Sequence, residues 1–212
     1  MNLQIERLYQ ISRKKARLII GLMSGTSLDG LDIALCRIEH AGKITKIQLE
    51  KFSTMEYDDE FRTRVREVFA KRHIDQQLFS GLNAYIGITH ANLINAALKQ
   101  WNIANSEIDF IASHGQTVYH APKSLTKDQN WPNSTLQIGD GDHIAVHTGI
   151  ITLSDFRQKH IAAGGEGAPL AAYGDYLLFS HPTENRFLLN IGGISNFTFI
   201  PSHQTKLKAY AT

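Results

Sequence analysis

A short polar turn between two apolar segments holds the first residues of this chain that could do chemistry. Its glycines allow backbone angles closed to other residues, while its hydroxyl and N–H groups can face phosphate oxygens. Asp29 or Asp32 could hold Mg²⁺ through water, because Mg²⁺ favours carboxylates together with retained water and substrate phosphates. The pattern predicts a hairpin that binds a nucleoside triphosphate. Its candidate binding residues are Gly25, Thr26, Ser27, Leu28, Asp29, Gly30, Leu31 and Asp32.

A plain β-hairpin with a polar turn is the competing interpretation of these residues. A P-loop is excluded, because no Gly-x-x-x-x-Gly-Lys-Ser/Thr sequence occurs. Two hydrolytic chemistries also lack their motifs. His143 and His147 stand four apart, but Ile144 replaces the glutamate of a His-Glu-x-x-His metalloprotease, and no Gly-x-Ser-x-Gly nucleophile elbow is present.

The apolar patterns around the turn predict a meander of strands followed by two amphipathic helices. A buried strand is expected before the turn, and an alternating apolar and polar strand after it. Asp58 and Asp59 can cap the first helix, and a long apolar stripe supports the second. The predicted elements are strands at 18–23, 31–35 and 44–53 and helices at 58–72 and 75–101.

A second polar segment, Ser113 to Thr117, follows residues 108–112, whose apolar character predicts a short buried strand. Polar residues released at the C-terminal end of a strand commonly line a cleft in α/β proteins, so we expect this segment at a binding site. The chain is then expected to form a strand at 135–138, a helix closed by Gly149, and a strand at 150–153.

A third segment combines charged residues with a glycine-rich loop. Asp155 and Arg157 are expected at a strand end, and Pro169 near the start of a helix that reaches about Phe179. Asp155 can accept hydrogen bonds from sugar hydroxyls, Arg157 can clamp a carboxylate, and Glu166 can bond to hydroxyl or amide groups. A structural ion pair between Asp155 and Arg157 is the alternative.

The segment Leu188 to Ile200 repeats the order of the first hairpin, with a glycine turn at Gly192 and Gly193. Residues 206–211 are expected to add a third strand. Two such hairpins resemble the superfamily of acetate and sugar kinases, chaperones and actin, in which two related domains clamp a nucleotide. The expected fold class is α/β, an actin-like (ribonuclease-H-like) sugar-kinase fold. The expected domains are an N-terminal extension (1–17), a complete first domain (18–183) and the opening strands of a truncated second domain (184–212).

Six motifs, taken in order along the chain, closely resemble those of the anhydro-N-acetylmuramic acid kinase family. They are Gly-Leu-Met-Ser-Gly-Thr-Ser-Leu-Asp-Gly-Leu-Asp, Ser-His-Gly-Gln-Thr, Gln-Ile-Gly-Asp-Gly, Ser-Asp-Phe-Arg, Ala-Ala-Gly-Gly-Glu-Gly-Ala-Pro-Leu and Asn-Ile-Gly-Gly-Ile-Ser-Asn. The resemblance implies ATP and Mg²⁺ as cofactors, with Gly192 and Gly193 as further ATP contacts. The substrate contacts that it implies are His114, Gln116, Gln137, Asp155, Arg157, Gly164, Gly165 and Glu166. Glu166 and His160 depart from the glutamine and aspartate of the family pattern and alter the charge there.

The resemblance implies a coupled hydrolysis and phosphorylation. A base activates water to attack the anomeric carbon of 1,6-anhydro-N-acetylmuramic acid, and the oxygen released at carbon six takes the γ-phosphoryl group of ATP. The product, N-acetylmuramic acid 6-phosphate, belongs to peptidoglycan recycling. The family's catalytic aspartate is expected in an Asp-x-Gly-Pro-Gly-Asn motif beyond Thr212, so no catalytic residue is assigned and the chain is expected to be an inactive N-terminal fragment. A catalytically dead sugar- or nucleotide-binding protein is the alternative.

Composition narrows the remaining classes of function. The 212 residues carry a formal net charge of +2 and are 42% hydrophobic, which argues against nucleic-acid binding and for an ordinary globular core. Cys36 is the single cysteine, so no disulfide can form within these residues, and no apolar run is long enough to cross a membrane. A cytoplasmic location is expected by default. The expected partner is the small anhydro sugar, without nucleic acid or membrane, and a homodimer is left open.

Overall fold

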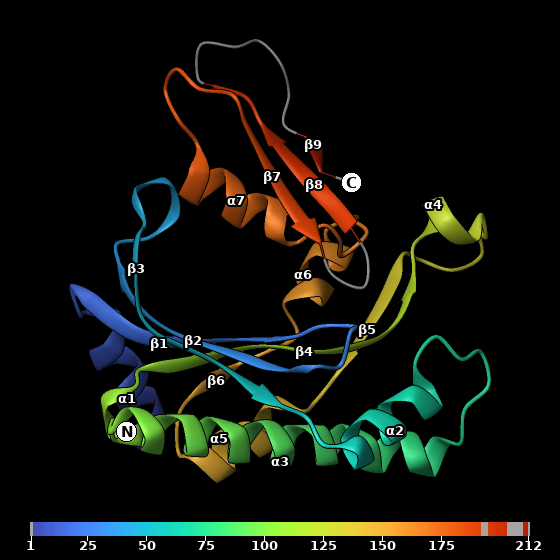
Figure 1. Ribbon diagram of the computed structural model, residues 1–212, viewed down its shortest axis with the longest axis horizontal. Helices are drawn as coiled ribbons and strands as arrows, with labels where there is room; N and C mark the ends of the chain where they lie inside the picture. Colours follow the sequence, from blue (N-terminus) through green and yellow to red (C-terminus); the bar gives the residue numbers. More distant parts are fainter. Residues whose placement is uncertain (1, 192–194, 203–209, 212) are drawn as a thin grey trace. The chain divides into compact units, whose positions relative to one another are not determined.

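The computed structural model describes residues 2–191, 195–202 and 210–211 (Figure 1). The chain divides into two compact units, and each of them collects segments from separate parts of the sequence. The first unit comprises Met1–His40, Lys46–His120 and Leu136–Phe156, and the second comprises Ala41–Thr45, Ala121–Thr135 and Arg157–Thr212.

A six-stranded mixed sheet is the main feature of the first unit. Its strand order is β3-β2-β1-β4-β5, and β6 pairs with β4 off that path. The first three strands form an antiparallel meander, whereas β4 runs parallel to β1 and β6 runs parallel to β4. The meander confirms the hairpin expected around the polar turn. The strands are β1 (Ala16–Ser24), β2 (Gly30–Glu39), β3 (Lys46–Glu56), β4 (Phe110–Ala121), β5 (Ser134–Ile138) and β6 (Thr152–Leu153).

Helices cover one face of this sheet (Figure 1). The Asp58 and Asp75 carboxylates accept hydrogen bonds from backbone N–H groups in the first turns of α2 and α3, as an N-cap does. Gly149 ends α5 in the left-handed conformation, as the sequence predicts. The helical elements of this unit are α1 (Leu3–Ser12), α2 (Asp59–Val68), α3 (Gln76–Trp101), η2 (Asn105–Glu107) and α5 (Gly141–Thr148).

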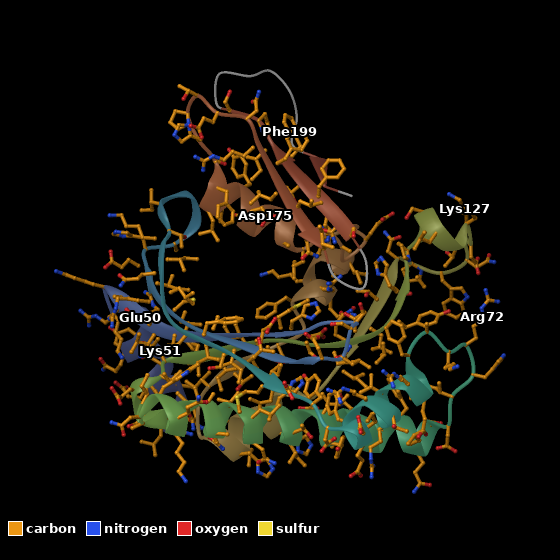
Figure 2. The ribbon with its side chains drawn as sticks, in the orientation of Figure 1. Glu50, Lys51, Arg72, Lys127, Asp175 and Phe199 are labelled. Carbon is orange, nitrogen blue, oxygen red and sulfur yellow. The ribbon has the colours of Figure 1, made fainter. Side chains whose placement is uncertain are left out.

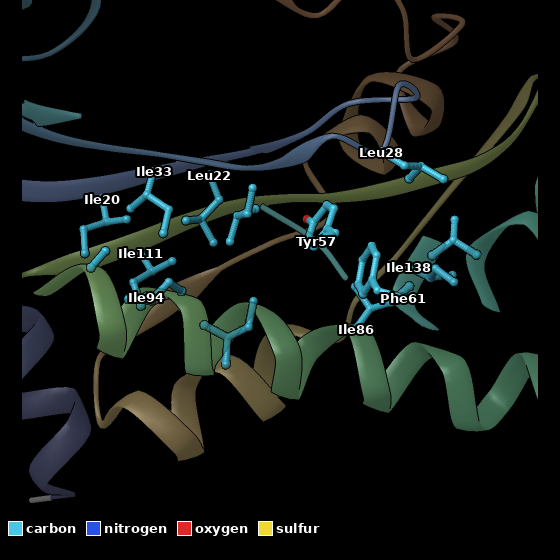
Figure 3. Packing of buried hydrophobic residues seen from close by; sticks show 14 of the residues in the cluster. Ile20, Leu22, Leu28, Ile33, Tyr57, Phe61, Ile86, Ile94, Ile111 and Ile138 are labelled. Atoms are coloured by element: carbon cyan, nitrogen blue, oxygen red, sulfur yellow. The ribbon is translucent and has the colours of Figure 1, made fainter. Parts of the chain in front are cut away.

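The hydrophobic core lies between the sheet and these helices (Figure 3). Leu31, Ile33 and Leu35 are buried together, because alternate residues of β2 point to the same face of the sheet. They belong to one cluster with Ile86 and Ile94 of α3. Each such side chain contributes about 1.5–3 kcal/mol by leaving water. The core therefore fixes the register of β2, and with it the turn that precedes this strand.

The second unit contains a β-hairpin and short helices. β7 pairs antiparallel with β8, and β8 with β9. The Thr198 hydroxyl of β8 donates a 2.7 Å hydrogen bond to Asp175 of α7; Figure 2 labels Asp175 and Phe199, the residue after Thr198. The side chains of Phe187 and Leu189 on β7 are 70% and 67% exposed. The elements are η1 (Gly42–Ile44), α4 (Lys123–Thr126), α6 (Phe156–Ala162), α7 (Ala171–Phe179), β7 (Arg186–Ile191), β8 (Ser195–Ile200) and β9 (Tyr210–Ala211).

Three expectations about secondary structure are wrong. The strand expected to end at Ala112 continues as β4 to Ala121, so the polar segment after Ala112 lies within a strand. Arg157 lies on the short helix α6 and not at a strand end. The helix expected to reach Arg72 ends at Val68. Most of the third strand expected at 206–211 lies outside the described residues, and only Tyr210–Ala211 is seen as β9.

Within the residues that the structure describes, no helix combines the length and the apolar character needed to cross a membrane. The division into domains at residue 183 remains a prediction.

Candidate functional site

The turn between β1 and β2, Gly25 to Gly30, has several carbonyl groups that accept hydrogen bonds from groups within the protein. The Leu28 N–H donates to Gly25 O at 3.3 Å, and the Arg62 Nε–H donates to Leu28 O at 3.0 Å. The Tyr57 N–H donates to Asp29 O at 3.2 Å. Because the carbonyl oxygens of Gly25, Leu28 and Asp29 are engaged inside the protein, they are not free to repel an anion that approaches the exposed side chains of the turn. We name Gly25 to Gly30 the phosphate turn.

The side chains of the phosphate turn divide into an exposed and a buried set. Thr26, Ser27 and Asp29 are exposed, whereas Leu28 is buried in the core. The Ser27 hydroxyl donates a 2.5 Å hydrogen bond to Asp29 Oδ1, and this bond lowers the pKa of that carboxyl below its ordinary value. Asp29 is thus anionic at neutral pH. Leu28 and Leu31, both buried, can offer only backbone groups to a ligand.

Gly30 ends the phosphate turn where two strands approach closely. A Cβ atom at this position would lie 2.6 Å from the Met55 carbonyl oxygen of β3. Only glycine fits here, so the sequence requirement at Gly30 comes from strand packing.

Asp32 lies two residues beyond the turn on the face of β2 opposite the core. Its carboxylate accepts a 2.6 Å hydrogen bond from the Thr54 hydroxyl, directly across the strand pair. Nowhere in the described part of the chain do three His, Cys, Asp or Glu side chains gather in a group that could hold a metal ion. Asp29 and Asp32 are therefore carboxylates that could share a cation with phosphate oxygens and water, and not a complete protein cage.

A β-bulge in β4 brings polar residues to the sheet edge beside the turn. Leu22 pairs with Ser113 but Ser24 pairs with Gln116, so β4 has one extra residue between the two pairs. Gly115 takes a φ of +71°, and a Cβ there would lie 2.8 Å from the Ile138 carbonyl oxygen. The bulge explains how β4 can continue through the polar segment that is expected to follow the end of a short strand.

A polar pocket of about 290 Å³ opens on this side of the bulge in the first unit. The bulge, the start of α5 and the segment after β6 surround it, with one residue from α3. A Cβ on Gly141 would lie 2.6 Å from the Ser154 hydroxyl, so the helix start and the segment after β6 pack closely and a side chain at Gly141 would require Ser154 to move. Its lining residues are Asn83, Ser113, His114, Gly115, Gln137, Ile138, Gly139, Asp140, Gly141, Asp142, Ser154 and Asp155.

Three of the predicted substrate residues, His114, Gln137 and Asp155, meet in this pocket. The Gln137 amide donates a 3.2 Å hydrogen bond to the Thr117 hydroxyl, which orients its side chain. Asp155 has a φ of +62°, in the left-handed region that non-glycine residues rarely adopt. The pocket wall partly shields the Asp155 carboxyl from water and raises its pKa. The site thus offers an amide, an imidazole and a carboxyl to a polyhydroxylated ligand.

The buried Ser113 hydroxyl is a further lining group with unused hydrogen-bonding capacity. Its oxygen is inaccessible to solvent, and no hydrogen-bond partner for it exists among the described residues. Buried polar groups are nearly always paired, so this hydroxyl is suited to a partner supplied by a bound molecule or by water.

Gln116 differs from the other predicted substrate residues, because its side chain is fully buried and engaged within the protein. It accepts a 2.5 Å hydrogen bond from the Ser24 hydroxyl and donates to the carbonyl oxygens of Gly25 and Thr117 at 3.4 and 3.2 Å. These contacts favour a role in holding the phosphate turn over direct contact with the sugar.

The remaining predicted substrate residues belong to the second unit. Gly164, with a φ of +89°, and Gly165 close the end of α6, because their N–H groups donate to Ile161 O and His160 O. Arg157 donates to the Gly167 carbonyl at 3.2 Å, and burial lowers the pKa of its guanidinium. Arg157 thereby braces the glycine-rich loop.

His160, one of the two residues expected to depart from the family pattern, also contacts this loop. Its Nδ1 accepts a 3.1 Å hydrogen bond from the Gly167 N–H. A Cβ on Gly165 would fall on the imidazole ring, 2.1 Å from Nε2. Glu166 lies between these anchored residues and is half-buried. Gly192 and Gly193, the predicted ATP contacts of the second hairpin, lie outside the described residues.

Sequence reasoning missed five polar lining residues of the pocket. Four of them lie in or next to the motifs from which the other site residues are predicted, so their positions in the sequence could have indicated them. Asn83 comes from the middle of α3 and has no local signal, although its side chain accepts a 2.8 Å hydrogen bond from the Gly139 N–H. The missed residues are Asn83, Ser113, Asp140, Asp142 and Ser154.

Comparison with known proteins gives one consistent family. The family model for anhydro-N-acetylmuramic acid kinase matches residues 17–212. A protein of that name from Pseudoalteromonas atlantica is 59% identical over 201 residues, which are 95% of this chain and 50% of the relative. Relatives with the same name from Pseudoalteromonas translucida and Bacillus thuringiensis are 55% and 43% identical, over 96% and 88% of this chain and 51% and 48% of their own length. The chain spans about half the length of these curated relatives, and it belongs to the anhydro-N-acetylmuramic acid kinase family.

Proposed function

We propose that the protein is an ATP-dependent kinase that opens the 1,6-anhydro ring of anhydro-N-acetylmuramic acid with water and phosphorylates O6. The name of the matching family supports the reaction class and the sugar. The observation that carries the proposal is the arrangement within the first unit. One bulged strand, β4, lies beside the phosphate turn through Gln116 and lines a polar pocket through Ser113 and His114. The product would be N-acetylmuramic acid 6-phosphate, an intermediate of peptidoglycan recycling.

An actin-like fold is part of the same proposal. A mixed sheet with helices on one face is compatible with a sugar-kinase-like fold. The antiparallel β1-β2-β3 meander, followed by a parallel β4, and a second hairpin at β7 and β8 support the actin-like assignment. In this arrangement the two hairpins would serve related roles in the two domains.

The phosphate turn fits the triphosphate of ATP and its Mg²⁺. The exposed Thr26 and Ser27 hydroxyls can donate to phosphate oxygens, and Gly30 allows the close strand approach that fixes the turn. Asp29 and Asp32 would hold Mg²⁺ through water. When bound, the nucleotide supplies the phosphoryl group that O6 of the sugar accepts, and this transfer depends mainly on positioning and charge neutralisation.

The polar pocket fits the sugar. Its buried Ser113 hydroxyl, the His114 imidazole and the Asp155 carboxyl can hydrogen-bond the ring hydroxyls and the N-acetyl group. Arg157 belongs to the second unit and is proposed separately, as a ligand for a carboxylate such as a lactyl group, because a guanidinium matches a carboxylate with two parallel hydrogen bonds. The general base is not assigned to any residue of this chain.

The decisive experiment uses the full-length protein with ATP, Mg²⁺ and anhydro-N-acetylmuramic acid. Mass spectrometry should show the sugar gaining one water and one phosphoryl group, and the Asp29→Ala variant should lose this conversion. Release of phosphate from ATP without sugar phosphorylation would contradict the proposal. Binding of sugar and nucleotide without any conversion would support the alternative, a non-catalytic binding protein.

A further inference from the structure

Four buried polar side chains form a continuous hydrogen-bonded chain that ends at the phosphate turn. His90 of α3 lies 2.9 Å from the Tyr57 hydroxyl, measured from Nε2. That hydroxyl lies 2.8 Å from Ser24 Oγ at the end of β1, and Ser24 Oγ lies 2.5 Å from Gln116 Oε1 of β4. The side chains of His90 and Gln116 are fully buried, and Tyr57 and Ser24 nearly so. We name these four residues the buried polar chain.

The direction of every hydrogen bond in the buried polar chain follows from its last member. The Gln116 Nε2 group must be a donor, because it faces the carbonyl oxygens of Gly25 and Thr117. Gln116 Oε1 therefore accepts the only proton of Ser24, and Ser24 Oγ accepts the proton of Tyr57. The Tyr57 oxygen must then accept from His90.

The state of His90 agrees with this direction. Its Nε2 carries the proton that Tyr57 accepts, which leaves Nδ1 unprotonated. Nδ1 is then an acceptor, and no hydrogen-bond partner for it exists anywhere in the described chain. Each member has one state that satisfies its neighbours, so the chain holds a single geometry.

The buried polar chain is not needed to fill the core. The Tyr57 ring stacks on Phe61 with a centroid distance of 3.7 Å, and a phenylalanine would keep this packing without burying a hydroxyl. The polar atoms instead connect two points of the phosphate turn. Gln116 holds Gly25 O at its start, and the backbone N–H of Tyr57 holds Asp29 O near its end.

We propose that Tyr57 and His90 are positioning residues for the phosphate turn, acting through Ser24 and Gln116 to fix the separation of its two ends. The inference rests on the proposed function, in which this turn binds the triphosphate of ATP. Neither side chain touches the ligand, since both are buried behind the turn. Loss of the chain leaves the turn residues present but less well ordered, and the affinity for the nucleotide falls while that for the sugar is retained.

The main test is Tyr57→Phe in the full-length protein, with Tyr85→Phe as the matched control. Both changes remove one phenolic oxygen from a ring near Phe61, but Tyr85 lies outside the buried polar chain. Loss of one link should raise the KM for ATP about fivefold or more, with less than about a twofold change in the KM for the sugar. Tyr85→Phe should leave both constants near their wild-type values. Equal increases in the two constants for Tyr57→Phe would overturn the inference.

Two substitutions of His90 test the direction of the chain. His90→Gln retains an N–H donor near the position of Nε2, whereas His90→Met has similar length and no donor. His90→Gln should keep the affinity for ATP, and His90→Met should weaken it as Tyr57→Phe does. Equal ATP affinity in the two variants would contradict the assigned direction.

Amide hydrogen exchange separates a failure of this inference from a failure of the proposed function, because it needs no substrate. The amide hydrogens of the peptide covering Gly25 to Asp29 should exchange about tenfold faster in Tyr57→Phe than in the wild type. Their exchange rate should be unchanged in Tyr85→Phe. Unchanged exchange in both variants overturns the inference even if the wild type is an active kinase. If the wild type binds ATP without phosphorylating the sugar, the proposed function fails, and calorimetric ATP affinities of the variants still decide the inference. Absence of ATP binding by the wild type overturns both.

Discussion

The buried imidazole of His90 makes the stability of the first unit depend on pH in a calculable way. Complete burial on α3 lowers the pKa of His90 from 6.5 to about 3. Between these two values the unfolded chain binds a proton at this site and the folded protein does not. The free energy of unfolding therefore falls as the pH falls, by about 1.4 kcal/mol per pH unit. Between pH 7.5 and pH 4.5 the contribution of His90 amounts to about 2.7 kcal/mol.

The measurement compares the wild type with His90→Gln and His90→Met in urea unfolding at pH 7.5, 6.0 and 4.5. Trp101 packs against the core of the first unit, so its fluorescence reports that unit once the exposed Trp131 is replaced by phenylalanine in all three proteins. Other titrating groups contribute equally to the three proteins. The difference between wild type and variants thus isolates His90.

Both variants remove the titrating group, although only His90→Gln keeps a donor to Tyr57. For each variant, the free energy of unfolding relative to that of the wild type should therefore be about 2.7 kcal/mol more favourable at pH 4.5 than at pH 7.5. Parallel curves for wild type and variants over this range would refute the conclusion that burial keeps His90 neutral.

Three further outcomes test the site and its scaffold in the full-length protein. Asp29→Ala and Thr26→Ala should each reduce turnover by about 100-fold or more with little loss of stability, because both side chains are exposed, and near-normal turnover in both would remove the phosphate turn from the mechanism. Arg157→Lys should raise the KM for the sugar more than the KM for ATP, because lysine lacks the bidentate fork, whereas equal changes would show that its bond to the glycine-rich loop is its whole role. Gly115→Ala should destabilise the protein by about 2–4 kcal/mol in thermal or urea unfolding, because Gly115 has a positive φ and the added Cβ would meet the Ile138 carbonyl oxygen. The control, Gly81→Ala on the open surface of α3, should be neutral or stabilising.

The sequence predicted those parts of the fold that local patterns determine. The first hairpin and α3 agree with their predicted positions because alternation in β2 and the apolar stripe of α3 are both strong. α6 was missed because it has only seven residues and runs directly into a glycine-rich cap. Its boundaries depend on that cap, and on the Arg157 and His160 contacts to Gly167, more than on helix propensity.

The candidate site was predicted less completely, because distant segments build it. His114, Gln137 and Asp155 were found from motifs, and the structure gathers them in one pocket. Asn83 joins them from a helix that the sequence marks only as amphipathic. His90 carries no motif at all, and its importance depends on a partner 33 residues away in the chain. Such long-range pairings have no signature in a single sequence.

The bulge in β4 explains why residues of one strand both support the phosphate turn and line the pocket. Without an extra residue, side chains before and after Gly115 would continue strict alternation, and Gln116 would leave the buried face that Ile111 and Ser113 occupy. With the bulge, Gln116 returns to that face opposite Ser24 and completes the buried polar chain. Ser113 and His114, on the other side of the bulge, line the pocket. One left-handed glycine therefore links the register of the phosphate turn to the wall of the polar pocket, and a substitution at Gly115 should disturb both at once.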